Sequence, residues 1–211
     1  MDFIPDAIQT YAEQHSAPES ALLRQINRDT HADVLSPRML SGHLQGRLLA
    51  MISKMTQPQS ILEIGTYTGY SALCLAEGLR PDGKLITIDR NEEIASRVRA
   101  YFALSPWQHQ LELVIADAKA FIPTLDEVFD LVFIDADKAG YQAYFDLVVD
   151  KVRAGGIIIA DNVLWSGKVV ADQPDRETLA MKAFNDTVCK DARVEPLLLP
   201  VRDGLLLLRK I

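Results

Sequence analysis

From residue 59 onward, short apolar segments alternate with helical segments, and this rhythm admits few folds. The pattern predicts strands over residues 60–64, 84–89, 111–115, 129–134, 157–160, 193–199 and 204–209. Helices are predicted over 70–79, 92–104, 141–152 and 177–190. Such an order predicts an α/β fold, doubly wound, with a mostly parallel sheet and right-handed crossovers. The last two strands have no helix between them, so we expect a hairpin and an antiparallel edge.

The first 55 residues differ from the rest because they are predicted to be helical throughout. Segments 6–15 and 18–28 carry apolar residues at helical spacing, and 39–55 is more strongly amphipathic. We expect this N-terminal segment to pack on the sheet or on a second subunit. With no repeat and no long linker, residues 1–211 are predicted to form one domain.

Charge and cysteine content narrow the function classes. The formal charge of −7 argues against a broad nucleic-acid-binding face. No apolar stretch reaches the length of a membrane span, and the N-terminus lacks a signal-peptide pattern. These features predict a cytoplasmic protein without membrane partners. Cys74 and Cys189 lie far apart in helix-like stretches, which predicts two buried free thiols.

One stretch, FDLVFIDADK over residues 129–138, couples a buried strand to a charged cluster. The apolar run 131–134 suits a strand buried on both faces. Asp135, Asp137 and Lys138 follow where that strand leaves the sheet. Because ligands bind outside the carboxyl ends of strands in open α/β sheets, this is a candidate site. The alternative is a simple polar turn.

The stretch ILEIGTYTGYS over residues 61–71 predicts a ligand loop between the first strand and its helix. Gly65 and Gly69 permit a tight turn and close backbone approach. Tyr67 stands where the dinucleotide fingerprint has its second glycine, which weakens the case for NAD. Glu63 could accept hydrogen bonds from a backbone amide or a ligand ammonium. Asp89 could accept hydrogen bonds from both hydroxyls of a ribose.

These groups together favour an adenosine ligand with cationic groups and no diphosphate, which S-adenosylmethionine satisfies. The alternative is that Glu63 and Asp89 only cap the following helices. Asp117, after the third strand, could meet an adenine amino group or could be a helix N-cap.

Side chains with oxygen atoms that can bind a metal follow two strands that we expect to be neighbours. Asp135 follows the strand 129–134, and Asp161 and Asn162 follow the strand 157–160. Adjacent strands lie about 4.8 Å apart, so these side chains can converge. Two carboxylates and an amide oxygen favour Mg²⁺, Mn²⁺ or Ca²⁺ over zinc. The alternative is a set of loop acids and an asparagine turn.

A divalent cation suggests methylation of an activated hydroxyl. Such an ion lowers the pKa of a bound hydroxyl and orients it. Lys138 could then take the proton, provided that its surroundings disfavour the ammonium form. The alternative is an exposed turn lysine. Asp137 points the other way along an extended chain, so we assign it to the acceptor or to Lys138 instead of the metal.

Several stretches together resemble the cation-dependent O-methyltransferases, which include the catechol and caffeoyl-CoA enzymes and bacterial members. They are ILEIGTYTGYSALCLAEGL, KLITID, FDLVFIDADKAGYQAYF, GGIIIADNVLWSGKV and RDGLLLLRKI, within residues 39–211. The resemblance implies a class I methyltransferase sheet of seven strands, the last antiparallel, and a homodimer. It implies that Lys138 is the base and that Asp135, Asp161 and Asn162 bind the metal. The cofactor contacts it implies are Glu63, Gly65, Tyr67, Ser71 and Asp89, with Met39 and Ser41 covering the cofactor; Asp117, Ala118 and Asp135 complete the candidate cofactor set.

Two features depart from the resemblance. Ala116 stands where many members have a glycine before the adenine contact. Asp137 replaces an aromatic residue of the catechol enzyme and matches the Asp-Ala-Asp-Lys of the caffeoyl-CoA and bacterial branch. The segment 165–175, which begins at Trp165, is expected to shape the acceptor pocket together with the N-terminal fifty residues.

The preferred hypothesis is therefore methyl transfer from S-adenosylmethionine to one hydroxyl of a vicinal dihydroxy aromatic, with Mg²⁺ or a similar ion. A second hypothesis keeps the site and replaces the phenolic acceptor by a hydroxylated tRNA nucleoside, bound by Arg47, Lys54, Lys168 and Arg202. A nicotinamide-dependent oxidoreductase is disfavoured by the glycine spacing. A non-catalytic binding module would require the cluster at 135–138 to be only a polar turn.

Overall fold

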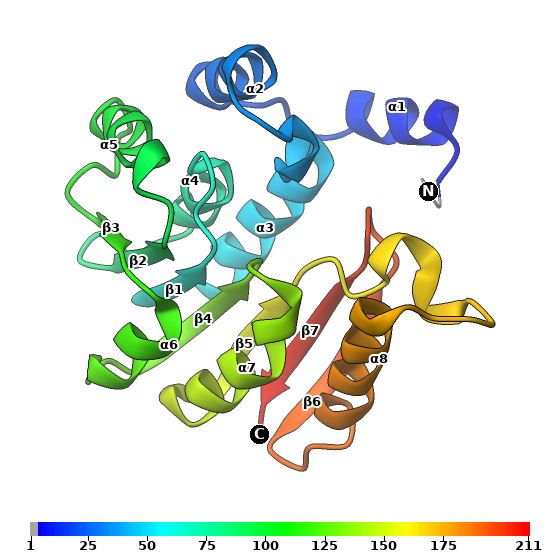
Figure 1. Cartoon of the computed structure of the whole chain (residues 1–211). Coiled ribbons are helices and arrows are strands. Elements are labelled where there is room, and N and C mark those ends of the chain that lie inside the picture. The colour runs from blue at the N-terminus through cyan, green and yellow to red at the C-terminus, as the bar shows by residue number, and fades with distance from the viewer. Residues whose placement is uncertain (1–3) are drawn as a thin grey trace.

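The computed structural model describes residues 4–211 and contains a seven-stranded sheet (Figure 1). The strand order is β3-β2-β1-β4-β5-β7-β6. The strands are β1 (Ser60–Ile64), β2 (Lys84–Asp89), β3 (Leu111–Ile115), β4 (Phe129–Ile134), β5 (Val152–Ala160), β6 (Val194–Leu199) and β7 (Leu205–Lys210). β1 to β5 pair in parallel, and β7 is antiparallel to both of its neighbours. The predicted doubly wound α/β sheet with an antiparallel last strand is confirmed.

The predicted hairpin forms an antiparallel edge of the sheet, and β7 is its inner strand. β7 pairs with β5 on one side, where Ala160 is opposite Leu206, and with β6 on the other. The outermost strand is therefore β6. Of the two hairpin strands, β7 is the more buried and occupies the inner position, while four of the six β6 residues are exposed. This arrangement brings the β6–β7 turn to the edge of the sheet where β5 ends.

The boundaries of β1, β2, β3 and β4 agree with the prediction, but β5 begins five residues before the predicted start at 157. Residues 154–156, which carry two glycines and read as a turn in the sequence, lie inside the strand. Phe129 pairs with Val152 and Leu131 pairs with Ile157, so the register shifts between these two pairs. Gly155, with φ of +77°, accommodates this irregularity.

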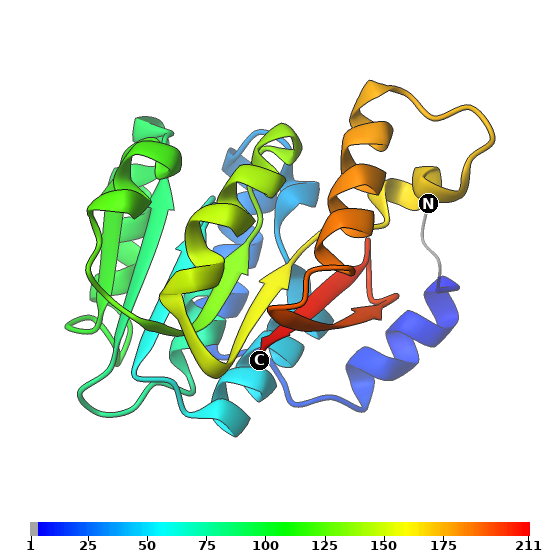
Figure 2. The same ribbon diagram turned by 90° about the horizontal axis from the view of Figure 1, so that it is seen from below.

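Helices cover both faces of the sheet, and each face has its own apolar core. The helices are α1 (Asp6–Gln14), α2 (Ala21–Asp33), α3 (Gly42–Thr56), α4 (Tyr70–Ala76), α5 (Ala95–Ala103), α6 (Ala118–Phe121), α7 (Tyr141–Val148) and α8 (Arg176–Val188). α6, α7 and α8 pack on one face, and α2 to α5 pack on the other. Figure 2 shows the sheet between α7 and α8 on one side and α1 and α3 on the other.

Alternating side chains of one strand enter different cores. Val132 and Ile134 of β4 join the α7–α8 core, whereas Leu131 and Phe133 join the α2–α5 core. Because both faces are covered, the strand is apolar at nearly every position, as a buried parallel strand requires. The N-terminal helices α2 and α3 pack on this face of the sheet. Packing on the sheet was one of the two alternatives for the N-terminal segment.

Capping residues fix where several helices begin. Ser20 accepts a hydrogen bond from the Leu23 amide, so α2 starts at Ala21 and the predicted start at Pro18 lies before it. Asp175 caps α8 in the same way through the Thr178 amide. Short 3₁₀ segments adjoin the helices, including η1 (Pro37–Met39) and η6 (Trp165–Val170).

Two further observations concern membrane spans and the cysteines. Across residues 4–211, every helix is too short or too polar to cross a bilayer. Cys74 is buried as predicted, whereas Cys189 is exposed because it lies at the C-terminal end of α8. The expectation of two buried thiols is therefore wrong for Cys189. Of the N-terminal segment predicted to be helical, residues 1–3 lie outside the described part.

Candidate active site

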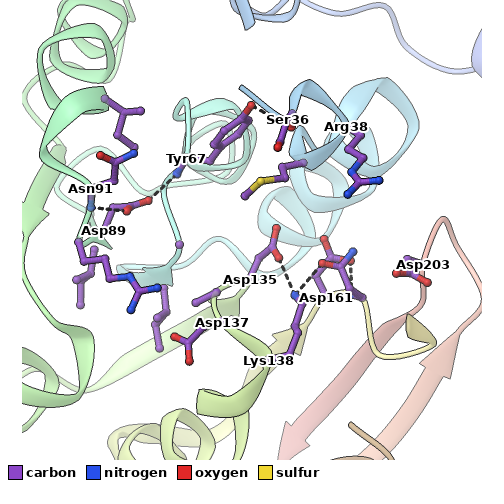
Figure 3. Close-up of a pocket in the computed structure, with 18 of the residues that line it drawn as sticks. Ser36, Arg38, Tyr67, Asp89, Asn91, Asp135, Asp137, Lys138, Asp161 and Asp203 are labelled. Atoms are coloured by element: carbon purple, nitrogen blue, oxygen red, sulfur yellow. Dashed lines mark hydrogen bonds and ion pairs between the residues drawn. The ribbon is translucent and has the colours of Figure 1, made fainter. Parts of the chain in front are cut away.

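A cleft of about 1380 Å³ lies at the carboxyl ends of the parallel strands (Figure 3). One end is formed by the loops after β1, β2 and β3, and includes Tyr67, Asp89 and Asp117. The other end is formed by the residues after β4 and β5, with η6 and the β6–β7 turn beside them. Such a cleft at the strand ends is the usual ligand site of an open α/β sheet.

Gly65 is required by a close backbone approach at the start of the first loop. Its φ is +102°, and a Cβ atom there would lie 1.8 Å from the carbonyl oxygen of Asp135. The Gly65 amide donates to the Ile88 carbonyl oxygen at 2.9 Å. The loop after β1 is thereby held against both β2 and the first residue after β4.

The Asp89 carboxylate organises the same loop. Its Oδ2 accepts hydrogen bonds from the Thr66 amide at 3.1 Å and from the Tyr67 amide at 2.9 Å. Its Oδ1 accepts from the Asn91 amide at 2.9 Å. These bonds orient the carboxylate at the cleft wall (Figure 3), where it could also accept hydroxyl groups of a ligand. The Tyr67 hydroxyl donates to the Leu35 carbonyl oxygen at 3.1 Å, which ties the loop to the N-terminal segment.

Glu63 and Ser71 lie beneath the loop instead of lining the cleft. Glu63 is fully buried and accepts a hydrogen bond from the Thr87 hydroxyl at 2.5 Å. Its Oε1 atom has no hydrogen-bond partner among the described residues. Burial raises the pKa of Glu63 to about 8, with smaller contributions from the charges of Asp135 and Asp89. Without a rearrangement, a ligand in the cleft reaches neither carboxyl oxygen.

The remaining candidate cofactor contacts divide in the same way. Met39, Asp117, Ala118 and Asp135 line the cleft, and Asp117 also caps α6 by accepting from the Lys119 amide. Ser41 is buried away from it. Asp117 is therefore a helix cap that also lines the cleft, and its contact with an adenine stays a prediction.

The predicted metal ligands and Lys138 meet at one point (Figure 3). Lys138 Nζ is 3.2 Å from Asp135 Oδ1 and 2.8 Å from Asn162 Oδ1. It also donates to the Tyr141 hydroxyl at 2.5 Å. The Lys138 side chain is only 14% exposed, which argues against the alternative of an exposed turn lysine.

Asp161 completes this group from the end of β5. It is 1% exposed, and its Oδ1 accepts from the Asn162 amide at 2.7 Å. Burial, followed by repulsion from Asp135, raises the pKa of Asp161. Two carboxylates held near each other in this way favour a bound cation, which relieves their repulsion.

The donor set fits a hard cation. Within residues 4–211, no three His, Cys, Asp or Glu side chains are grouped as a metal site. The candidate ligands are instead Asp135, Asp161 and the amide oxygen of Asn162. An ammonium already lies between two of these oxygens, which shows that they can share one positive charge. Oxygen donors of this kind suit Mg²⁺, Mn²⁺ or Ca²⁺.

Asp137 is separate from this group. Its Oδ1 accepts from the Tyr144 hydroxyl at 2.5 Å, and Figure 3 shows it pointing away from Asp135. Neither Lys138 nor the predicted metal ligands bond to it. Trp165 lines the cleft, as expected for the acceptor end, together with Asp203, which accepts from the Ser166 amide.

Three residues in or behind the site have roles that the sequence did not predict. Tyr141 accepts from Lys138 and donates to the Asp161 carbonyl oxygen at 2.9 Å; its position three residues after Lys138, one helical turn away, was an available signal. Gln45 and Arg202 form hydrogen bonds behind Asp161. Gln45 is a polar residue within the apolar stripe of residues 39–55, which was the only hint in the sequence.

The fold and the cleft define a class I methyltransferase, and comparisons identify the family. A family profile described as O-methyltransferase matches residues 13–211. Caffeoyl-CoA O-methyltransferase from Mesembryanthemum crystallinum is 36% identical over 187 residues, which are 79% of this chain and 71% of that protein.

Two solved structures are similar over nearly their whole length. A Podospora anserina methyltransferase with SAH bound superposes with a TM-score of 0.90 at 28% identity, covering 100% of this chain and 99% of that one. The O-methyltransferase TomG from Streptomyces achromogenes, in complex with SAM, gives 0.88 at 28% identity, covering 97% and 96%. The chain therefore belongs to the O-methyltransferase family, and it is a class I, S-adenosylmethionine-dependent O-methyltransferase.

Proposed function

We propose that this enzyme methylates one hydroxyl of a small vicinal dihydroxy aromatic, with S-adenosylmethionine as donor and a divalent cation as cofactor. The observation that carries the proposal is the contact between Gly65 and Asp135, which joins the donor loop and the oxygen cluster in one cleft. The similar solved structures bound to SAM or SAH support the donor. A caffeoyl-CoA enzyme among the relatives supports a phenolic acceptor.

The donor would occupy the end of the cleft formed by Tyr67, Asp89 and Asp117. Asp89 would accept hydroxyl groups of the ribose, because its carboxylate is already oriented there by backbone amides. Met39, on η1, would cover the donor from the N-terminal side.

Asp135, Asp161 and Asn162 would hold the cation, with Mg²⁺ favoured by the oxygen-only set. When bound, such an ion would lower the pKa of the acceptor hydroxyl and help to orient the acceptor. Lys138 lies within hydrogen-bond distance of two of these ligand oxygens, so an acceptor hydroxyl near them is within reach of Nζ.

In the transfer step, the acceptor oxygen forms a bond to the methyl carbon while the bond from that carbon to sulfur breaks. The sulfonium becomes a neutral thioether, and the hydroxyl proton passes to Lys138, whose ammonium must first have released one proton to solvent. The buried Tyr141 hydroxyl accepts a hydrogen bond from Nζ and keeps it facing the cleft. Burial raises the pKa of Tyr141 well above its usual range, so this tyrosine stays protonated.

The test is turnover of S-adenosylmethionine with a panel of catechols, measured with and without added Mg²⁺. We expect a methylated product that requires the metal and disappears in Asp161→Ala. No product from any catechol would refute the acceptor class. Turnover that persists in Asp161→Ala with excess chelator would refute the metal role while leaving the donor intact.

The RNA hypothesis receives no support from the four basic residues that carried it. Arg47 and Lys54 both pair with Glu77, at 2.6 and 2.5 Å. Lys168 pairs with Asp175 at 3.0 Å, and Arg202 donates to backbone carbonyl groups. Each of these side chains is thus paired within the protein. Family membership likewise removes the basis for an oxidoreductase or a non-catalytic module.

We also propose a cytoplasmic homodimer assembled through the N-terminal helices. Ile8 and Tyr11 of α1 are 58% and 63% exposed, and Met51 and Met55 of α3 are 56% and 77% exposed. Apolar side chains left open on two neighbouring helices favour contact with a second copy. Light scattering at several concentrations tests this, and a mass of one chain throughout would refute it.

A further inference from the structure

Gln45 of α3 contacts a candidate metal ligand from behind. Its Nε2 lies 2.6 Å from Asp161 Oδ2, although the two residues are 116 positions apart in sequence. Gln45 is fully buried and Asp161 is 1% exposed, so water does not compete for this bond. A buried hydrogen bond of this kind fixes the orientation of its acceptor.

Arg202, in the β6–β7 turn, fixes the orientation of the Gln45 amide. Its guanidinium donates to Gln45 Oε1 at 3.2 Å. Because arginine can only donate, the oxygen of the amide must face Arg202 and the NH₂ group must face Asp161. Arg202 is itself held by the carbonyl oxygens of Ser41 and Arg38.

The consequence is that Asp161 accepts a hydrogen bond at both oxygens. Oδ2 accepts from Gln45, and Oδ1 accepts from the Asn162 amide at 2.7 Å. The plane of the carboxylate is therefore set by two donors of fixed direction. Each carboxylate oxygen has a second lone pair, which leaves acceptor capacity for a cation.

We propose that Gln45 and Arg202 are positioning residues that orient Asp161 for cation binding. This inference rests on the metal dependence proposed above and concerns how this chain supports it. Hydrogen-bond partners behind metal ligands typically contribute about 10–100-fold in affinity or activity. Gln45 contacts Asp161 directly and Arg202 contacts Gln45, so we expect both to act through the orientation of the carboxylate.

The experiment titrates the purified protein with Mn²⁺ alone. Calorimetry or electron paramagnetic resonance measures the Mn²⁺ affinity. Gln45→Leu removes the donor, Arg202→Met frees the amide to rotate, and Arg202→Lys retains one donor. Gln142→Leu is the matched control, because it breaks an exposed bond from glutamine to Asp146 of 2.9 Å on α7. We expect Mn²⁺ to bind about 10–100-fold more weakly to Gln45→Leu and about 10-fold more weakly to Arg202→Met, with partial recovery in Arg202→Lys.

Activity gives a second readout that a purely structural role would not reproduce. In Arg202→Met, the Mn²⁺ concentration for half-maximal turnover should rise about 10-fold, while kcat at saturating Mn²⁺ stays within a few-fold of the parent. Loss of folded protein would lower turnover equally at every metal concentration.

The outcomes separate this inference from the proposed function. If the parent binds Mn²⁺ and the folded variants bind it equally well, the positioning role is refuted and the metal dependence stands. If the parent itself does not bind Mn²⁺, the metal dependence fails and the inference fails with it. If Gln45→Leu does not fold, the two Arg202 variants decide, because Arg202 lies in a half-exposed turn.

Discussion

Substituting Gly65 by alanine should damage both ends of the cleft at once. The added Cβ would lie 1.8 Å from the Asp135 carbonyl oxygen and 2.6 Å from its carbonyl carbon. These are backbone atoms, and Asp135 is also tied to β1 by its amide, which donates to Ile64 at 2.8 Å. The clash can be relieved only by moving the loop or the first residue after β4.

The size of the effect follows from two contributions. An alanine forced to positive φ costs ~1–2 kcal/mol, and overpacking typically costs ~1–3 kcal/mol. The sum of ~2–5 kcal/mol corresponds to a decrease in Tm of roughly 4–20 °C for a chain of this length. Gly42→Ala is the matched control: its φ is +74°, but no atom lies within 4 Å of the added Cβ. It should lose only the first contribution, roughly 2–8 °C.

Thermal unfolding and titration with S-adenosylhomocysteine measure the two consequences. We expect Gly65→Ala to bind S-adenosylhomocysteine at least about 10-fold more weakly, by the geometry argument for displaced binding groups. Gly42→Ala should bind it like the parent. Equal Tm losses in the two variants, together with unchanged binding in Gly65→Ala, would refute the argument that a close approach to Asp135 requires glycine.

Three further predictions concern single side chains. Lys138→Met should lower kcat by about 10²–10⁴-fold without changing the affinity for S-adenosylhomocysteine. The control Lys190→Met should change neither quantity. Turnover at the parent rate in Lys138→Met would exclude Lys138 as the base. Glu63 has a pKa raised to about 8 by burial, so the folded state binds more protons than the unfolded state between about pH 4.5 and 8, and stability falls as pH rises through that range. Glu63→Gln avoids this loss, so its Tm relative to the parent should increase from about pH 5 to about pH 8; a difference independent of pH would contradict the assignment. Tyr141→Phe leaves the Asp161 carbonyl oxygen without that donor and should lower Tm by roughly 2–8 °C, with a smaller loss of kcat than Lys138→Met; a loss as large as that of Lys138→Met would give Tyr141 a direct role.

The strands were predictable where both faces of the sheet are covered. β4 carries an uninterrupted apolar run from Leu131 to Ile134, and its observed ends match the expected ones. The start of β5 was not predictable, because Gly155-Gly156 resembles a turn and its role in the irregular pairing depends on β4. The inner position of β7 likewise depends on pairing between strands, which the chain order alone does not reveal.

The site was predictable to the extent that it lies at strand ends. Asp135, Asp161 and Asn162 come together because parallel strands end at one edge of the sheet. Burial of Glu63 was not predictable, since an acid at a strand end is equally compatible with an exposed position. Gln45 and Arg202 lie 116 and 41 residues from Asp161 in sequence, on either side of it, so no local pattern connects them to it.

The division of the cleft has a practical consequence for protein engineering. Tyr67, Asp89 and Asp117, at the proposed donor end, belong to loops after β1, β2 and β3, whereas η6 follows β5. A mutant library confined to residues 165–175 would therefore vary the proposed acceptor end while leaving the Gly65 loop intact. Asp203 lies outside that range and would continue to anchor η6 through the Ser166 amide. Variants selected to methylate new phenolic acceptors would then not need additional mutations to restore donor binding.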